Sequence, residues 1–373
     1  MIADHRLMLV LLHEDGRRLK QTPIEPDFDP AIEWTRFEAL RNGYRDAAVL
    51  SAVVSTELLW DRKAGEPYLR GFSVSLMAEA ATPTSEFGLP FFRAEAEAAA
   101  AALLKSGELS SDDSYSYSVV AFPSQGVEKA AGDAERPAFE LSTEPVPVPS
   151  IEDRSLSAYC ERAGDGTGAE SDDFPVFISG LVLEEAVEQT RRERGRETGG
   201  VLLGRLHRDS ESSELFAEVT AQIPARHTKS DSVSLTFTSD TWSDVRAALE
   251  IRGKEELMLG WYHSHPVREW CRECPLERQR SCGLASDFIS AHDRLLHRAM
   301  FPSGYSLALI LNDVSFSDVT TSLFGWRRGR LVSRGFHRLD VAGVARTAIA
   351  ARPTIPVLPT TPARPTIPTP PTT

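Results

Sequence analysis

This chain of 373 residues has few cysteines, few long apolar segments and few basic residues, and each shortage argues against a class of protein. Four cysteines are too few for a disulfide framework in so long a chain, so they indicate free thiols or metal ligands. The apolar run at residues 7–12 is too short, and too closely flanked by charge, to be a secretory signal or a membrane span. We interpret it as a first strand and expect a cytoplasmic protein that does not bind membranes.

Positive charge is also in short supply. The chain has 41 Lys and Arg against 54 Asp and Glu, which gives a formal net charge of −13. This acidic surplus argues against nucleic acid as a partner. The basic residues are mostly arginine, a bias typical of GC-rich bacterial genomes. The hydrophobic content of 41% is normal for a globular protein, and the length predicts two domains rather than one.

Two proline-rich segments divide the chain. Residues 126–173 combine a Pro-Val repeat with a Gly/Ser/Asp-rich stretch, and we predict a linker with a short helix within 151–162. Residues 351–373 repeat Pro-Thr and cannot bury a core, which predicts a disordered or extended tail. The linker separates a domain at residues 1–125 from a second domain at residues 174–340.

The first 125 residues predict a small α+β domain. We expect strands at 47–60, 68–79 and 115–122, and a helix in the alanine-rich stretch 93–106. No catalytic motif is visible in this part, so its role stays open.

The second domain predicts an α/β architecture, a mixed sheet flanked by helices. Its expected strands cover residues 175–180, 197–206, 215–223, 234–238, 257–263, 305–311, 322–327 and 330–339. Its expected helices cover residues 183–194, 239–251 and 290–300.

The richest chemistry lies at the end of the apolar strand 257–263. Side chains alternate across a strand, so His263 and His265 lie on the same face and can share one metal ion. Asp293, on the helix 290–300, would add a carboxylate. Three N/O ligands with a fourth position left to water are typical of a catalytic zinc site. Alone, however, the pair of histidines is weak evidence for a metal site, because histidines near a strand end are more often ordinary polar edge residues.

Three segments together resemble one known family. His263-Ser264-His265-Pro266, followed by Ser290-x-x-Asp293, resembles the JAMM motif of the JAB/MPN metalloproteases. Residues 197–204, Glu-Thr-Gly-Gly-Val-Leu-Leu-Gly, resemble the segment that carries the family's glutamate. The resemblance covers residues 174–339 and implies the cytidine-deaminase-like JAB/MPN fold, here in a bacterial member with an N-terminal extension.

The resemblance also implies roles for single residues. Zn²⁺ would be held by His263, His265 and Asp293. Glu197 would act as the general base, and Ser290 would donate a hydrogen bond to the developing oxyanion. From their own sequence context, Glu197 could instead be a solvated charge after an arginine-rich stretch, and Ser290 the N-cap of its helix.

The implied function is hydrolysis of an amide or isopeptide bond at the C-terminus of a ubiquitin-like protein, for processing or deconjugation. The expected partners are that protein or its conjugate, and a neighbouring activating or conjugating enzyme. Gly199 and Gly200 would let a substrate backbone approach closely. Two alternatives stay open: a non-catalytic MPN scaffold and a metal-binding regulatory module.

One departure from the family is an insertion at residues 267–289, between the motif's proline and its serine. It contains Cys271, Cys274 and Cys282. A C-x-x-C pair with a third cysteine nearby predicts a second, structural zinc site. Its fourth ligand is not evident, and the candidates are Cys160, His292 and His297. The alternatives are three free thiols or an iron–sulfur cluster, although a cluster normally needs four cysteines.

Overall fold

The computed structural model describes residues 5–63, 66–123, 146–164, 173–193, 195–225, 228–230, 235–253, 255–275, 288–315 and 318–339. These residues form two compact units. The first comprises the described residues up to Pro149 together with 302–304 and 326–331, and the second comprises the others. None of the described helices is long and apolar enough to cross a membrane.

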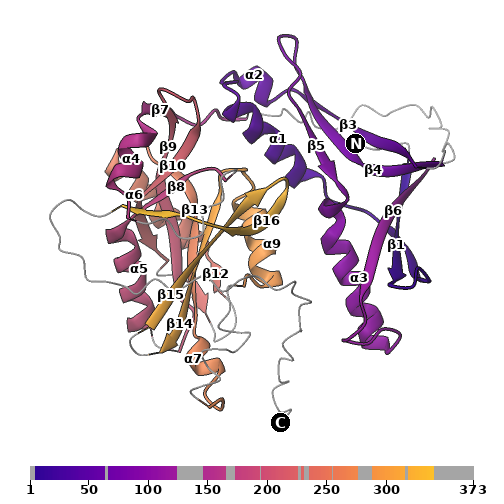
Figure 1. Cartoon of the computed structure of the whole chain (residues 1–373). Helices are drawn as coiled ribbons and strands as arrows, with labels where there is room; N and C mark the ends of the chain where they lie inside the picture. Colours follow the sequence, from indigo (N-terminus) through magenta and orange to yellow (C-terminus); the bar gives the residue numbers. More distant parts are fainter. Residues whose placement is uncertain are drawn as a thin grey trace, which may run out of the picture. The chain divides into compact units, whose positions relative to one another are not determined.

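The first unit contains two small antiparallel sheets (Figure 1), with strand orders β2-β1-β6 and β3-β4-β5. The strands are β1 (His5–His13), β2 (Arg18–Ile24), β3 (Val53–Lys63), β4 (Glu66–Met77), β5 (Thr84–Gly88) and β6 (Tyr115–Pro123). The helices are α1 (Asp29–Arg41), α2 (Ala47–Leu50), α3 (Arg93–Ser106) and the short 3₁₀ helix η1 (Leu89–Phe92).

Helix α3 confirms the prediction made from its alanine-rich sequence. It ends at Gly107, whose φ of 77° lies in the left-handed region that glycine enters without steric cost. The core of this unit is aromatic. Phe72 of β4 is fully buried, and its ring contacts those of Phe28, Phe87, Phe91 and Phe92.

The prediction of one strand over residues 47–60 is wrong in its first part. Residues 47–50 form helix α2, and the strand begins only at Val53. The cause is local, because the side chain of Asp46 accepts a hydrogen bond of 2.8 Å from the backbone N–H of Ala48 and caps the helical turn.

The second unit is built on a nine-stranded mixed sheet of order β16-β15-β14-β13-β9-β10-β8-β17, with β7 also paired to β9 (Figure 1). The strands are β7 (Ile151–Arg154), β8 (Val176–Ser179), β9 (Gly199–Asp209), β10 (Leu215–Pro224), β13 (Leu257–His265), β14 (Leu307–Ser315), β15 (Asp318–Arg327), β16 (Arg330–Arg334) and β17 (His337–Leu339). A separate hairpin joins β11 (Thr228–Ser230) to β12 (Leu235–Phe237). The helices are α4 (Leu156–Arg162), α5 (Gly180–Arg192), α6 (Ser239–Arg252), α7 (Val267–Trp270) and α9 (Ala291–Met300).

The centre of this sheet holds the site. Strand β13 is antiparallel to β9 and parallel to β14, and its central residues are buried. Helix α5 packs against β8, β10 and β14. Mixed strand directions with flanking helices confirm the α/β architecture expected from the sequence.

Residues 330–339, predicted to be one closing strand, form two strands at opposite edges of the sheet. β16 lies beside β15, whereas β17 runs parallel to β8 at the far edge. The chain crosses because Leu339 enters a buried cluster with Tyr159, Phe177 and Phe216. The short helix expected within 151–162 is α4, and it is preceded by β7, which pairs with β9.

Candidate metal centre

Strand β13 divides its side chains between two faces. Trp261, His263 and His265 alternate with Tyr262 and Ser264, so the two histidines share a face, as the period of a strand requires. All five residues are at most 1% exposed. The face that carries His263 and His265 therefore presents two imidazoles to a site that is buried from solvent.

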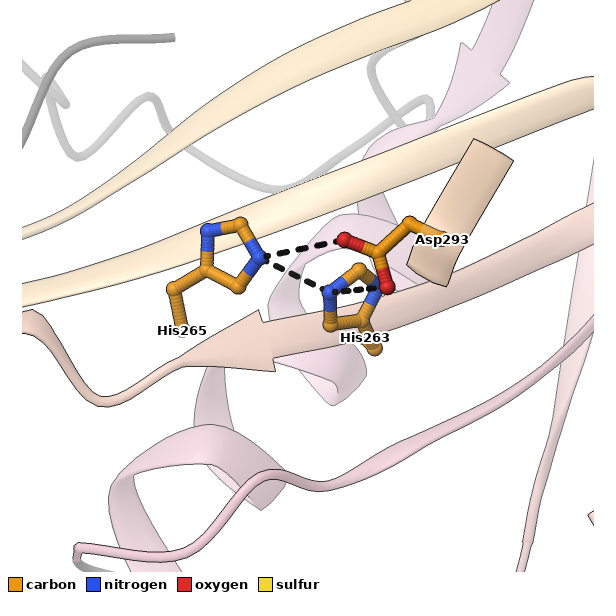
Figure 2. A group of neighbouring side chains, drawn as sticks. All are labelled: His263, His265 and Asp293. Carbon is orange, nitrogen blue, oxygen red and sulfur yellow. Dashed lines mark hydrogen bonds and ion pairs between the residues drawn. The ribbon is translucent and has the colours of Figure 1, made fainter. Parts of the chain in front are cut away.

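Asp293 of α9 completes a group of three metal-ligand side chains, which point toward one another in Figure 2. The Nε2 atoms of His263 and His265 lie 2.9 Å apart. One carboxylate oxygen of Asp293 lies 3.5 Å from Nε2 of His263, and the other lies 3.8 Å from Nε2 of His265. Within the described part of the chain, no other set of three such side chains comes this close together.

These distances fit a tetrahedral zinc ion. Ligand atoms about 2 Å from such an ion are separated from one another by roughly 3.3 Å. The two histidine nitrogens, 2.9 Å apart, and the two histidine–carboxylate distances, 3.5 and 3.8 Å through different oxygens of Asp293, are close to this value. Two nitrogens and one carboxylate leave a fourth position open, which is the pattern of a catalytic rather than a structural zinc site.

The protonation states also suit a metal. Burial, reinforced by the neighbouring His265, lowers the pKa of His263 to about 3, so its imidazole is neutral and has a lone pair to offer. Burial alone would raise the pKa of the Asp293 carboxyl. The neighbouring imidazoles of His265 and His263 and the hydrogen bond from Ser290 outweigh that effect and hold this pKa below its usual range.

Asn312 on β14 is a site residue that the sequence analysis missed. Its Oδ1 lies 3.0 Å from Nδ1 of His265, and since a carbonyl oxygen only accepts, His265 must donate from Nδ1. This fixes the tautomer and leaves Nε2 of His265 unprotonated toward Asp293. A signal was present, because Asn312 ends the apolar run of a strand parallel to β13 and pairs with His265 in register.

Ser290 occupies the N-cap of α9. Its hydroxyl accepts a hydrogen bond of 3.1 Å from the backbone N–H of Asp293, and Asp293 accepts one of 2.9 Å from the backbone N–H of Ser290. This capping box holds the Asp293 carboxylate at the start of the helix. The hydroxyl proton of Ser290 is not used in this exchange, so the cap leaves it able to donate.

Glu197 lies just before β9 rather than within it, because the strand begins at Gly199, two residues later than predicted from the sequence. Its side chain is buried, at 6% exposure. The next residue, Thr198, makes two hydrogen bonds to Ser264, which lies between the two histidines in the sequence. Ser264 donates its N–H to the Thr198 carbonyl (2.7 Å), and its Oγ accepts from the Thr198 N–H (3.0 Å). Ser264 thus ties the glutamate segment to the histidine strand.

A second support reaches Thr198 from α5. The hydroxyl of Tyr262 donates to Oε1 of Gln189 (2.7 Å), and Nε2 of Gln189 donates to Oγ1 of Thr198 (2.7 Å). Gly200 is explained by the same packing. A Cβ at this position would lie 2.2 Å from the Ile223 carbonyl oxygen and 2.7 Å from the Tyr262 ring. Packing within the sheet therefore explains why this position is glycine.

The predicted cysteine site is described only in part. Cys271 is buried and Cys274 half-buried, while Cys282 lies outside the described residues. Of the three candidate fourth ligands, His297 uses Nδ1 to accept a hydrogen bond from Trp261, and His292 and Cys160 are exposed. A second zinc stays a prediction.

A buried His-His-Asp group at the end of a central strand defines a metal-centre domain of the α/β class. Residues 175–282 match the family model described as JAB1/Mov34/MPN/PAD-1 ubiquitin protease. The chain therefore contains a JAB/MPN domain. The match includes Glu197, His263 and His265 and ends before Ser290 and Asp293. JAB domains occur both in active JAMM proteases and in inactive MPN proteins.

A solution structure of protein DSY2949 from Desulfitobacterium hafniense is similar to this chain, with 19% identity and a TM-score of 0.31. The similarity covers 44% of this chain and 92% of that one. No curated protein matches.

Proposed function

We propose that this protein is a zinc-dependent peptidase or isopeptidase that hydrolyses an amide bond at the C-terminus of a ubiquitin-like protein. The observation that carries the proposal is the buried group of His263, His265 and Asp293, with ligand atoms at zinc-like separations. The family of the domain supports the substrate class. We also propose a cytoplasmic location, because a chain of 373 residues with four cysteines does not have the composition of a disulfide-stabilised secreted protein.

In this proposal His263, His265 and Asp293 would hold a zinc ion, which would supply Lewis acidity for the scissile carbonyl and the attacking water. Glu197 accepts the proton of that water as it adds to the carbonyl carbon. Glu197 then delivers the proton to the leaving nitrogen as the C–N bond breaks. The Ser290 hydroxyl donates to the oxygen on which negative charge develops, an interaction that is worth most where water is excluded.

The test combines metal analysis with cleavage of a ubiquitin-like protein that carries a fluorogenic amide at its C-terminus. We expect the wild-type protein to bind zinc and to cleave, and a chelator to abolish cleavage. Glu197→Gln should keep the zinc and lower kcat by at least about a hundredfold, because a general base typically contributes 10²–10⁴-fold. His263→Ala should lose the zinc itself.

The outcomes separate the alternatives. Glu197→Gln cleaving as fast as wild type would show that the general base is assigned to the wrong residue. Zinc binding without any cleavage would favour the non-catalytic scaffold or the regulatory module. The same metal analysis tests the cysteine site, since a second equivalent of zinc should survive His263→Ala and disappear in Cys271→Ser/Cys274→Ser.

A further inference from the structure

The two histidines of the metal centre are oriented by different means. His265 is held through Nδ1 by Asn312. Nδ1 of His263 is buried and has no hydrogen-bond partner among the described residues. The His263 ring instead lies flat on the indole of Trp261, with centroids 4.7 Å apart and ring planes 7° from parallel. The orientation of His263 therefore depends on the orientation of Trp261.

Trp261 is in turn held by a buried hydrogen bond to the helix that carries Asp293. Its Nε1–H donates to Nδ1 of His297 over 3.0 Å, and both side chains are at most 1% exposed. His297 follows Asp293 by four residues, so the two lie one turn apart on the same side of α9. The Trp261–His297 bond thus links the strand of the two histidines to the helix of the aspartate.

His297 is suited to accept this bond. Burial lowers its pKa to about 3, so the ring stays neutral, and Nδ1 keeps its lone pair with the proton on Nε2. A buried indole N–H needs an acceptor, and an aliphatic side chain at this position would leave it unsatisfied. His297, which is not a metal ligand, therefore holds the Trp261 ring that contacts the ligand His263.

We propose that His297 is a positioning residue of the metal centre. By holding Trp261 it sets the plane of His263 and keeps β13 and α9 at the separation that lets His263 and Asp293 bind one ion. The inference rests on the proposed zinc site, but it does not require that the site be catalytic.

The test measures zinc affinity by competition with a chromophoric chelator on the full-length chain. Trp261→Phe removes the N–H donor and keeps an aromatic ring against His263, and His297→Leu removes the acceptor. Each should weaken zinc binding by about tenfold or more, the effect typical of losing a group that orients a metal ligand. His297→Asn places an oxygen near the position of Nδ1 and should bind zinc like wild type.

Two comparisons separate positioning from general stability. Trp326→Phe changes another buried indole, on β15, and should leave zinc affinity unchanged. The double variant Trp261→Phe/His297→Leu should bind zinc no more weakly than the weaker single variant, because both remove one bond. If His297→Leu does not fold, Trp261→Phe with its Trp326→Phe control decides the question.

Zinc affinity equal to wild type in Trp261→Phe would overturn the inference and leave the proposed function standing. A folded His297→Asn as weak as His297→Leu would also overturn it. If the variants show the expected zinc affinities but the wild-type chain has no peptidase activity, the proposed function alone is overturned. A wild-type chain without affinity for zinc would overturn both.

Discussion

Single residues outside the three ligands determine how the ligands are presented. Asn312 orients His265 through a hydrogen bond, and Trp261 orients His263 through a stacked ring. Neither residue belongs to the motif by which the sequence resembles its family. The motif supplies the atoms that face a metal, while these neighbours fix the tautomer and the ring plane that make those atoms usable.

Asn312→Leu is expected to weaken zinc binding by about tenfold or more, because it removes the acceptor that holds the His265 tautomer. Asn312→Asp is the matched control. A carboxylate accepts the same hydrogen bond, so this variant should bind zinc about as well as the wild-type protein. Zinc affinity is measured by chelator competition. Wild-type affinity in a folded Asn312→Leu protein would contradict this role of Asn312.

At the scale of elements, α4 is joined to the end of β9 through Asp209. The carboxylate of Asp209 accepts hydrogen bonds from the hydroxyl of Ser212 (2.6 Å) and from the backbone N–H groups of Leu156 (2.8 Å) and Ser212 (2.8 Å). These bonds lower the pKa of Asp209 to about 2. The first turn of α4 is therefore anchored by a group that must stay ionised.

This anchor predicts a pH dependence of stability. The pKa of Asp209 in the fold lies below its value of about 4 in an unfolded chain, so the unfolded state takes up the proton first as the pH falls. The stabilisation is complete above about pH 4 and is lost toward pH 2. We expect Asp209→Asn to lower the urea midpoint at pH 6, and the difference from wild type to shrink toward pH 2. A difference that stays constant over this range would contradict the assignment.

How well elements could be predicted depends on where their stabilising contacts lie. Helix α3 follows from an alanine-rich sequence and a glycine at its end, both local features. Helix α1 was missed although Asp29 and Pro30 at its start are typical of a helix N-terminus. Strands β16 and β17 could not be separated from sequence alone, because β17 is stabilised by partners far away in the chain.

At the scale of the whole molecule, the metal centre lies in the second unit, while the first unit has its own sheets and its own aromatic core. The first unit carries no set of three metal-ligand side chains among its described residues. We propose that this unit recruits the substrate or a partner enzyme, because it folds around a core of its own.

A chain that begins at Ser150 should keep its zinc and cleave a short fluorogenic peptide as the full chain does. Ser150 is the suitable start, because β7 pairs with β9 in the sheet of the second unit. On a ubiquitin-like substrate we expect kcat/KM to fall by about tenfold, which corresponds to about 1.4 kcal/mol of lost binding. Equal kcat/KM for the two chains on that substrate would contradict a recruiting role.

The sequence by itself determined the chemistry of the candidate site. Two histidines at i and i+2 on an apolar strand must share a face, and a serine at the start of a helix is a typical N-cap. Both conclusions follow from local backbone geometry, which repeats at a fixed period wherever the strand or helix forms. They gave the local setting of His263, His265, Ser290 and Asp293, and the resemblance to the JAB/MPN family joined the four into one expected site.

Only the tertiary structure decided which groups support those residues. Asn312 meets His265 because β14 lies beside β13 in parallel register, and His297 meets Trp261 because α9 packs near that strand. Thr198 meets Ser264 across 66 positions of the chain. Contacts of this kind depend on strand order and helix packing, which sum many weak interactions over the whole domain, so no local pattern in the sequence specifies them.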